Sequence, residues 1–287
     1  MRTITATYPP LPLKYLLGRI SEFEGASLSL KHAIISELID VHPVLGVDFS
    51  KGSVFRRARK IGELDYPDSV QDLLWRLDGV ASVGRANPEG YPVLYVADRP
   101  ETAFAETHID GDFALLSELQ IREGYRCRIA PIGEMIRIQR SGRGFLSGQA
   151  SSTINDMLNA CSLDDAKSLL ITDAFLFECL VKDDAPYSLS SFVAKSIFEK
   201  NKEISSIAFP SVRQDGAINF AVKTEDFWNA WGVIGARRMY VRHLKCGFYE
   251  TSLTEHVVEL TPQGKLVWER GVVEDNVAMH FEPIWHP

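Results

Sequence analysis

An arginine, a tyrosine and a glutamate lie within one short stretch of this chain, and all three side chains are of types that bind or cleave charged ligands. Arg85 follows a glycine, Tyr95 lies in an apolar segment that predicts a strand, and Glu106 lies in the next segment, which predicts a helix. Side chains from a turn, a strand and a helix can converge on one pocket. Together they suit a negatively charged ligand that carries a ring and a sugar.

The cysteines and histidines argue against metal chemistry. The four cysteines are far apart and form no CxxC pair, so we expect neither a zinc site nor a disulfide framework. Free, buried thiols are the expected state. The seven histidines include no HExxH motif and no close pair, so we expect no metal centre.

The composition is ordinary for a soluble globular protein: 287 residues, of which 45% are hydrophobic and 24% charged. A net charge of -7 argues against bulk attraction to nucleic acid or to an anionic membrane, although it is compatible with a local basic pocket. No apolar run reaches the roughly 18 residues of a membrane-spanning helix. The N-terminus lacks the pattern of a secretory signal, so we expect a cytoplasmic protein.

Two predicted strands and one predicted helix position the candidate residues. Residues 53–59 predict a strand on which Phe55, Arg57 and Arg59 share one face, because side chains alternate along a strand. Residues 92–97 predict the strand of Tyr95. We expect Asp98 to cap the following helix in a capping box with Glu101, a helix that ends by residues 110–112.

The rest of the chain alternates between helical and strand-like patterns. Ser27 or Ser29 is expected to cap the second N-terminal helix, and Pro43 is expected to end it. The glycine- and serine-rich residues 140–152 lack a phosphate-loop lysine and predict a mobile loop. The periodicity predicts helices over 13–41, 69–77, 158–180, 188–201 and 225–231, strands over 125–138, 204–210 and 217–222, and a hairpin of 257–260 with 265–268.

Four sequence pieces occur in one order along the chain. They are Phe55-Arg56-Arg57-Ala58-Arg59, Gly84-Arg85-Ala86-Asn87-Pro88 with Val93-Leu94-Tyr95-Val96-Ala97, Glu101-Thr102-Ala103-Phe104-Ala105-Glu106, and Phe209-Pro210-Ser211-Val212-Arg213 followed by Asn219. Over about residues 52–223 the chain resembles the RES-domain family, which is named for an arginine, a glutamate and a serine. Members of that family are typically toxins of bacterial toxin–antitoxin pairs.

The resemblance implies an α/β (α+β) fold, a compact domain related to the ADP-ribosyltransferase fold. The expected division is an N-terminal helical extension over 1–50, the RES domain over 51–225 and a strand-containing C-terminal extension over 226–287. It also implies an enzyme that destroys NAD⁺ by hydrolysis or phosphorolysis, with transfer of ADP-ribose as the alternative. NAD⁺ is then a substrate, and no cofactor is expected.

The resemblance also assigns site residues by position. The namesake residues are Arg85, Glu106 and Ser211, and Tyr95 matches the family's strand tyrosine. The upstream arginine best matches Arg57.

One position allows a second assignment, and another departs from the family's pattern. Arg56 lies beside Arg57, so the arginine assignment can shift by one residue. Ala86 stands where many members have an aromatic residue, which can change the wall of the pocket.

The residue types suit this chemistry. Cleavage of the nicotinamide–ribose bond passes through an oxocarbenium-like state, which a carboxylate such as Glu106 can stabilise while it holds a ribose hydroxyl. Arg57 and Arg85 can hold the pyrophosphate. The ring of Tyr95 can stack on the nicotinamide, and Ser211 can bind the ribose or orient the glutamate. The leaving group needs no strong general acid, because nicotinamide already carries positive charge in NAD⁺.

A catalytically silent module that only binds NAD⁺ is a third hypothesis. The resemblance implies a neutralising antitoxin or immunity protein as partner. The added helices and the C-terminal strands can serve that contact or homo-oligomer formation, although packing on the core explains their apolar faces better.

Overall fold

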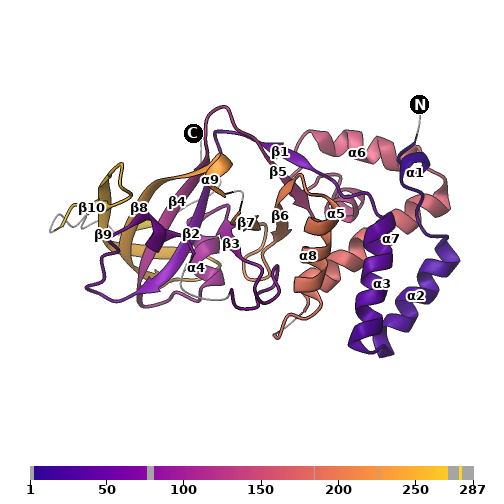
Figure 1. The fold of residues 1–287 in the computed structure, drawn as a ribbon, viewed down its shortest axis with the longest axis horizontal. Coiled ribbons are helices and arrows are strands. Elements are labelled where there is room, and N and C mark those ends of the chain that lie inside the picture. The colour runs from indigo at the N-terminus through magenta and orange to yellow at the C-terminus, as the bar shows by residue number, and fades with distance from the viewer. Residues whose placement is uncertain (1–2, 76–80, 184, 226, 271–277, 280–287) are drawn as a thin grey trace. The chain divides into compact units, whose positions relative to one another are not determined.

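The computed structural model describes residues 3–75, 81–183, 185–225, 227–270 and 278–279 (Figure 1). The chain forms two compact units, each built from several segments. The first unit comprises Met1–Asp48, Val80–Val93 and Arg128–Phe209, and the second comprises Phe49–Gly79, Leu94–Cys127 and Pro210–Pro287. The predicted domain boundaries at residues 50 and 225 remain a prediction.

The first unit is mainly helical. Its helices are α1 (Ile4–Thr7), α2 (Leu13–Gly25), α3 (Leu28–Val41), α5 (Glu134–Ser141), α6 (Ala150–Asn159), α7 (Leu163–Val181) and α8 (Ser190–Lys200). Its strands follow the order β1 (Val47–Phe49), β5 (Cys127–Pro131) and β6 (Ile204–Pro210), with β5 and β6 parallel. Leu16, Ile34 and Leu38 form a buried cluster between α2 and α3, which lie side by side in Figure 1.

The N-terminal helices confirm the sequence prediction over 13–41. The Ser27 hydroxyl accepts a hydrogen bond from the Leu30 amide, which settles the choice between Ser27 and Ser29 as the cap. Helix α3 ends at Val41, just before the His42-Pro43 pair. Helix α8 and strand β6 confirm two further predictions.

Two predictions in this unit are wrong. The expected strand over 125–138 ends at Pro131, because Gly133 takes a left-handed conformation (φ 85°) and starts helix α5. The expected helix over 158–180 is two helices, since α6 ends at Asn159 and Ser162 caps α7 by accepting from the Asp165 amide at 3.2 Å.

The glycine-rich stretch predicted as a mobile loop over 140–152 is shorter and anchored. Only residues 142–149 lie outside helices α5 and α6. The fully buried Glu134 carboxylate accepts the backbone amides of Phe145, Leu146 and Ser147 at 2.9, 3.0 and 2.6 Å. Three amides on one carboxylate fix the course of this loop.

The second unit is built on a sheet with the strand order β7-β3-β2-β4-β8-β9-β10. The strands are β2 (Val54–Ile61), β3 (Val93–Ala97), β4 (Asp112–Ile121), β7 (Ile218–Lys223), β8 (Trp231–His243), β9 (Tyr249–Leu260) and β10 (Leu266–Trp268), and β11 (Ala278–Met279) pairs with β9. The helices are η1 (Val70–Leu73), α4 (Pro100–Glu106) and α9 (Phe227–Ala230).

Most predicted strands of this unit are confirmed, including the hairpin of β9 and β10. Strand β4 was not predicted. The short helix expected over 69–77 is the 3₁₀ helix η1, and residues 76 and 77 lie outside the described part of the chain. The helix expected over 225–231 is the single turn α9, after which Trp231 begins β8.

The two faces of this sheet carry different cores. On one face, Ala103 and Phe104 of α4 pack in a buried cluster with sheet residues Ala58, Ala97, Ala114, Leu116, Met239, Val241 and Tyr249. On the other face, Phe55 contacts Phe220 and Trp231, with ring centroids 5.0 and 4.7 Å apart. We call the first the α4 face and the second the aromatic face.

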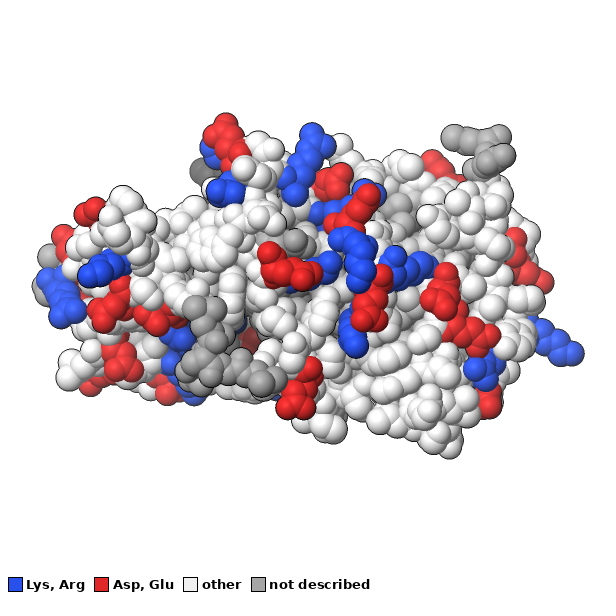
Figure 2. Space-filling view, in the orientation of Figure 1, with Lys and Arg blue, Asp and Glu red and all other residues white. Residues whose placement is uncertain are grey.

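The structure confirms the predicted α+β fold with N-terminal helices and C-terminal strands. In the part of the chain that is described, no helix has the length and apolar character needed to cross a membrane. Acidic and basic side chains are interspersed over the face drawn in Figure 2.

Candidate active site

Helix α4 carries Glu106 as its last residue, and its start differs from the prediction. Arg99, not Asp98, is the N-cap residue, and it makes no side-chain capping bond. Pro100 occupies the first helical position, where its missing amide hydrogen costs nothing. The Asp98 carboxylate instead accepts the Thr102 hydroxyl at 3.1 Å, and the helix ends at Glu106 rather than near residue 110.

Glu106 is bound by two side chains that are far away in the sequence. The Ser211 hydroxyl donates to Glu106 Oε1 at 2.7 Å, and the Asn219 amide donates to the same oxygen at 2.6 Å. Asn219 is buried, whereas Glu106 and Ser211 are half-buried. The two donors satisfy one carboxylate oxygen and fix the orientation of the other.

The second oxygen of Glu106 is the one a ligand can use. Within the described residues, no group donates a hydrogen bond to Oε2. A carboxylate oxygen accepts up to two hydrogen bonds, so Oε2 can bind a sugar hydroxyl or face a developing positive charge. The arrangement therefore presents one oriented, half-buried carboxylate oxygen.

Ser211 is itself held by the turn that follows it. Its Oγ accepts the backbone amides of Arg213 and Gln214, both at 3.1 Å, while its proton goes to Glu106. All bonding capacity of this hydroxyl is used by the protein. Ser211 is thus placed to orient the glutamate.

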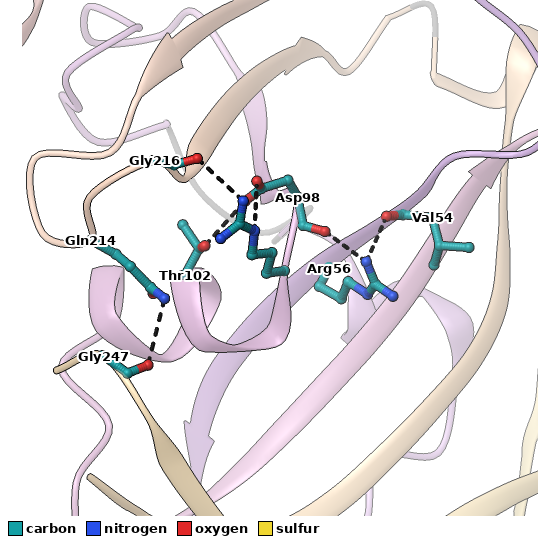
Figure 3. A network of polar contacts seen from close by, with 8 residues as sticks. Val54, Arg56, Asp98, Thr102, Gln214, Gly216 and Gly247 are labelled. Atoms are coloured by element: carbon teal, nitrogen blue, oxygen red, sulfur yellow. Dashed lines mark hydrogen bonds and ion pairs between the residues drawn. The ribbon is translucent and has the colours of Figure 1, made fainter. Parts of the chain in front are cut away.

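Polar contacts join the residues just before α4 to the residues that follow Ser211, and Figure 3 shows Asp98, Thr102 and Gly216 among them. Arg99 contacts the Asp98 carboxylate at 3.2 Å and donates to the Gly216 carbonyl at 3.3 Å. The Asp98 amide donates to the Ile218 carbonyl at 3.1 Å, and burial raises the pKa of the Asp98 carboxyl. This network joins the start of α4 to the end of residues 211–217, which connect β6 to β7 and which we call the Ser211 loop.

The sheet register separates Arg56 from Arg57. Arg56 lies opposite Ala97 of β3, so its side chain projects from the α4 face of the sheet. Its Nη1 donates to the carbonyls of Val54 and Asp98 at 3.0 and 2.6 Å (Figure 3). Arg56 therefore shares the sheet face on which the helix of Glu106 packs.

The side chain of Arg57 projects from the opposite, aromatic face of the sheet. It lies opposite Ser117 of β4, whose hydroxyl donates to the Leu73 carbonyl of η1. The Nη1 of Arg57 donates to the Tyr95 carbonyl at 3.2 Å. Burial, together with the nearby Arg59, lowers the pKa of Arg57 to about 10. Arg57 and Glu106 are thus associated with different faces of the sheet.

Tyr95 and Ala97 are two positions apart on β3, so the Tyr95 side chain also projects from the α4 face, where it is half-buried. Strand alternation therefore groups Tyr95 with Arg56.

Arg85 belongs to the first unit, where it binds the end of helix α7. Its Nη1 contacts the carbonyls of Leu180, Val181 and Asp183 at 3.0, 2.8 and 2.9 Å. The guanidinium also lies 5.2 Å from the centre of the Tyr187 ring. A cation at a helix C-terminus is favourable, because the last carbonyls lack helical partners. The neighbouring Ala86 is fully buried.

Asn219 follows the serine motif in the sequence, which indicates no role for it, and the structure places its side-chain amide on Glu106. An asparagine eight positions after a motif serine was the only available signal. The four cysteines are free. Cys127 and Cys179 are buried as predicted, whereas Cys161 is half-buried and Cys246 is exposed, so the prediction of buried thiols is wrong for these two. Among the described residues, no three His, Cys, Asp or Glu side chains are grouped as a metal site.

An α+β domain whose helix-borne glutamate is held by a serine and an asparagine fits the order of motifs in the sequence. The family model of the RES domain matches residues 57–233, more than half of the chain. The chain belongs to the RES-domain family, which confirms that prediction. Family membership suggests an enzyme that acts on NAD⁺ and is consistent with a toxin–antitoxin function. No curated protein and no solved structure matches the chain significantly.

Proposed function

We propose that this protein cleaves the nicotinamide–ribose bond of NAD⁺ and acts as a growth-arresting toxin. The observation that carries the proposal is the Glu106 carboxylate, whose Oε1 is bound by Ser211 and Asn219 and whose Oε2 has no donor within the described residues. Such a carboxylate is oriented before the substrate arrives. Preorganised charge is the largest contribution that many active sites make to catalysis.

In the proposed reaction, Oε2 of Glu106 faces the nicotinamide ribose. As the bond to nicotinamide breaks, positive charge develops on the ribose, and the carboxylate stabilises it. The same oxygen accepts a hydrogen bond from a ribose hydroxyl, which fixes the sugar. Nicotinamide leaves as a neutral molecule, so the reaction needs no strong general acid. This agrees with the residues proposed for the site, none of which is a histidine or a cysteine.

The other site residues are proposed as ligands for the rest of NAD⁺. Tyr95 stacks on the nicotinamide. Arg56 rather than Arg57 binds phosphate, because the Arg56 side chain projects from the same sheet face as helix α4. The role of Arg85 as a phosphate ligand stays a proposal, with Nε and Nη2 as the nitrogens that its carbonyl partners do not use.

The alternative is transfer of ADP-ribose to a protein or small molecule by the same residues. Both reactions begin with loss of nicotinamide and differ in the group that attacks the ribose. Water gives ADP-ribose, phosphate gives a phosphorylated ADP-ribose, and a target gives a labelled conjugate. The geometry of Glu106 suits all three acceptors.

Incubation of the purified protein with NAD⁺ labelled in the adenosine tests the proposal. The reaction is run with and without phosphate, and with and without cell lysate, and the products are identified by mass spectrometry. Free nicotinamide with unconjugated ADP-ribose, phosphorylated or not, supports the proposal. Label found only on a macromolecule favours transfer, and intact NAD⁺ under all conditions contradicts both.

The proposed partner is a neutralising antitoxin that prevents NAD⁺ cleavage. This follows from the family, and it predicts that growth arrest by the wild-type chain is relieved by a protein encoded beside it. A homo-oligomer remains a second proposal, which a measurement of mass in solution tests.

A further inference from the structure

The turn between strands β8 and β9 lies beyond the family match, which ends at residue 233, yet it contacts the elements that carry Glu106 and Ser211. Leu244 and Phe248 close the turn through the hydrogen bond from the Leu244 amide to the Phe248 carbonyl at 2.9 Å. Tyr249 follows as the first residue of β9. We call residues 244–249 the β8–β9 turn.

Its first contact is with helix α4. The Tyr249 ring is buried and lies against Phe104, with ring centroids 5.4 Å apart, and Phe104 is two residues before Glu106. Helix α4 has only seven residues, too few to be stable alone, so packing decides its position. Tyr249 therefore supports the part of α4 from which Glu106 extends.

A second set of contacts fixes the chain that leaves α4. The Gly111 amide donates to the Val241 carbonyl at 2.8 Å, and the His243 amide donates to the Asp110 carboxylate at 2.9 Å. Both bonds join the residues after Glu106 to the end of β8. Helix α4 is thus held on its buried side and at its exit.

The third contact is with the Ser211 loop. Gln214, whose amide binds Ser211 Oγ, approaches the Gly247 carbonyl with its Nε2 at 3.5 Å (Figure 3). Gly247 has a φ of 77°, and a Cβ there would lie 3.2 Å from Gln214 Nε2. The turn therefore contacts the Gln214 side chain, and a Cβ at position 247 would push on it.

We propose that Gly247 and Tyr249 are positioning residues that hold Ser211 and Glu106 in register, so that the functional domain extends past the family match into the C-terminal strands. The contacts form a closed path from Glu106 to Ser211, Gln214, Gly247, Tyr249, Phe104 and back to Glu106. A shift of the turn moves the two ends of the short Ser211–Glu106 bond apart. This inference rests on the proposed catalytic role of Glu106.

The chain offers a matched control. Gly264, in the turn between β9 and β10, has the same φ of 77°, but a Cβ there would meet no atom within 4 Å. Gly247→Ala and Gly264→Ala therefore introduce the same backbone strain, and only the first also pushes on Gln214. We expect Gly247→Ala to lower kcat for NAD⁺ at least about threefold with KM nearly unchanged, and Gly264→Ala to leave kcat as in the wild type.

A second pair of variants tests the aromatic contact. Tyr249→Phe keeps the ring against Phe104 and should retain the wild-type kcat, whereas Tyr249→Leu should lower it. Melting temperatures show which variants are folded at the assay temperature. Equal kcat values for Tyr249→Phe and Tyr249→Leu would overturn the role of the ring.

A readout without activity separates this inference from the proposed function. Amide hydrogen exchange at Arg213 and Gln214 reports on the bonds to Ser211 Oγ. Exchange there should become faster in Gly247→Ala and stay unchanged in Gly264→Ala, even if the wild type does not cleave NAD⁺. The same exchange rates and the same kcat in both glycine variants would contradict the proposal.

Discussion

Ser211 Oγ donates a 2.7 Å hydrogen bond to Glu106 Oε1, although the two residues are 105 positions apart. The bond joins the end of a two-turn helix to the loop after β6. Asn219 adds a second donor to the same oxygen from strand β7. Three segments thus fix one carboxylate, and the expected behaviour of variants follows from this geometry.

Ser211→Ala and Asn219→Ala should each lower kcat for NAD⁺ on the order of tenfold, because each removes one of the two bonds that orient Glu106. Their effects should not add, since both act through one oxygen. A double-mutant cycle should give a coupling of about 0.5–3 kcal/mol. Strictly additive losses would show that the two side chains do not act through Glu106.

Arg56→Lys should raise KM for NAD⁺ about tenfold, since lysine cannot form the paired hydrogen bonds of a guanidinium with phosphate. Arg57→Lys is the matched control, because it changes the neighbouring residue on the opposite face of the sheet. We expect its KM to stay close to that of the wild type. A larger rise in KM for Arg57→Lys would return the assignment to Arg57.

Arg85→Met should destabilise the protein by about 1–3 kcal/mol, because two carbonyls at the end of α7 and the Asp183 carbonyl just after it lose a charged donor. Arg140→Met, at the exposed last turn of α5, should change the free energy of unfolding by less than about 0.5 kcal/mol. Urea denaturation measures both. Equal stability of the two variants would mean that Arg85 does not support the end of helix α7. The KM of Arg85→Met for NAD⁺, measured at a temperature where this variant is folded, tests the role of Arg85 as a phosphate ligand.

Cys179 should make stability fall at alkaline pH. Burial, with the nearby Asp183 and Glu178 carboxylates, raises the pKa of this thiol from 9.0 to about 12. Between these values the unfolded chain loses the proton and the folded chain keeps it, so rising pH favours unfolding by at most about 1.4 kcal/mol per pH unit. Cys179→Ala should lose less stability than the wild type between pH 8 and 10.5 in urea denaturation. Identical losses would contradict this.

The sequence predicts most of the elements in which one face of the segment is polar or turn residues bound it. The sequence does not predict strand β4, because most of its side chains are buried on both faces of the sheet. Its polar and apolar residues therefore do not alternate. The alternation over residues 125–138 predicts a strand where helix α5 begins, and the turn between strand and helix depends on the left-handed conformation of Gly133. Local patterns do not show such a conformation.

The candidate site was predictable in its residue types and less so in its geometry. The motif order pointed to Glu106 and Ser211, which the structure brings into contact. Which of Arg56 and Arg57 shares a sheet face with helix α4 depends on the strand register, since a shift of one residue moves a side chain to the other face. The carbonyl partners of Arg85 lie 95 to 98 positions away, beyond any local pattern.

The central claim is that the Glu106 carboxylate drives cleavage of NAD⁺, and nicotinamide release by Glu106→Gln tests it most directly. Glutamine keeps the size of the side chain and an oxygen that Ser211 and Asn219 can still bind, but it has no charge. We predict that turnover falls about 100-fold or more, while the melting temperature changes little. Glu123→Gln, at an exposed glutamate paired with Lys51, should retain wild-type turnover. Full turnover in folded Glu106→Gln would contradict the account.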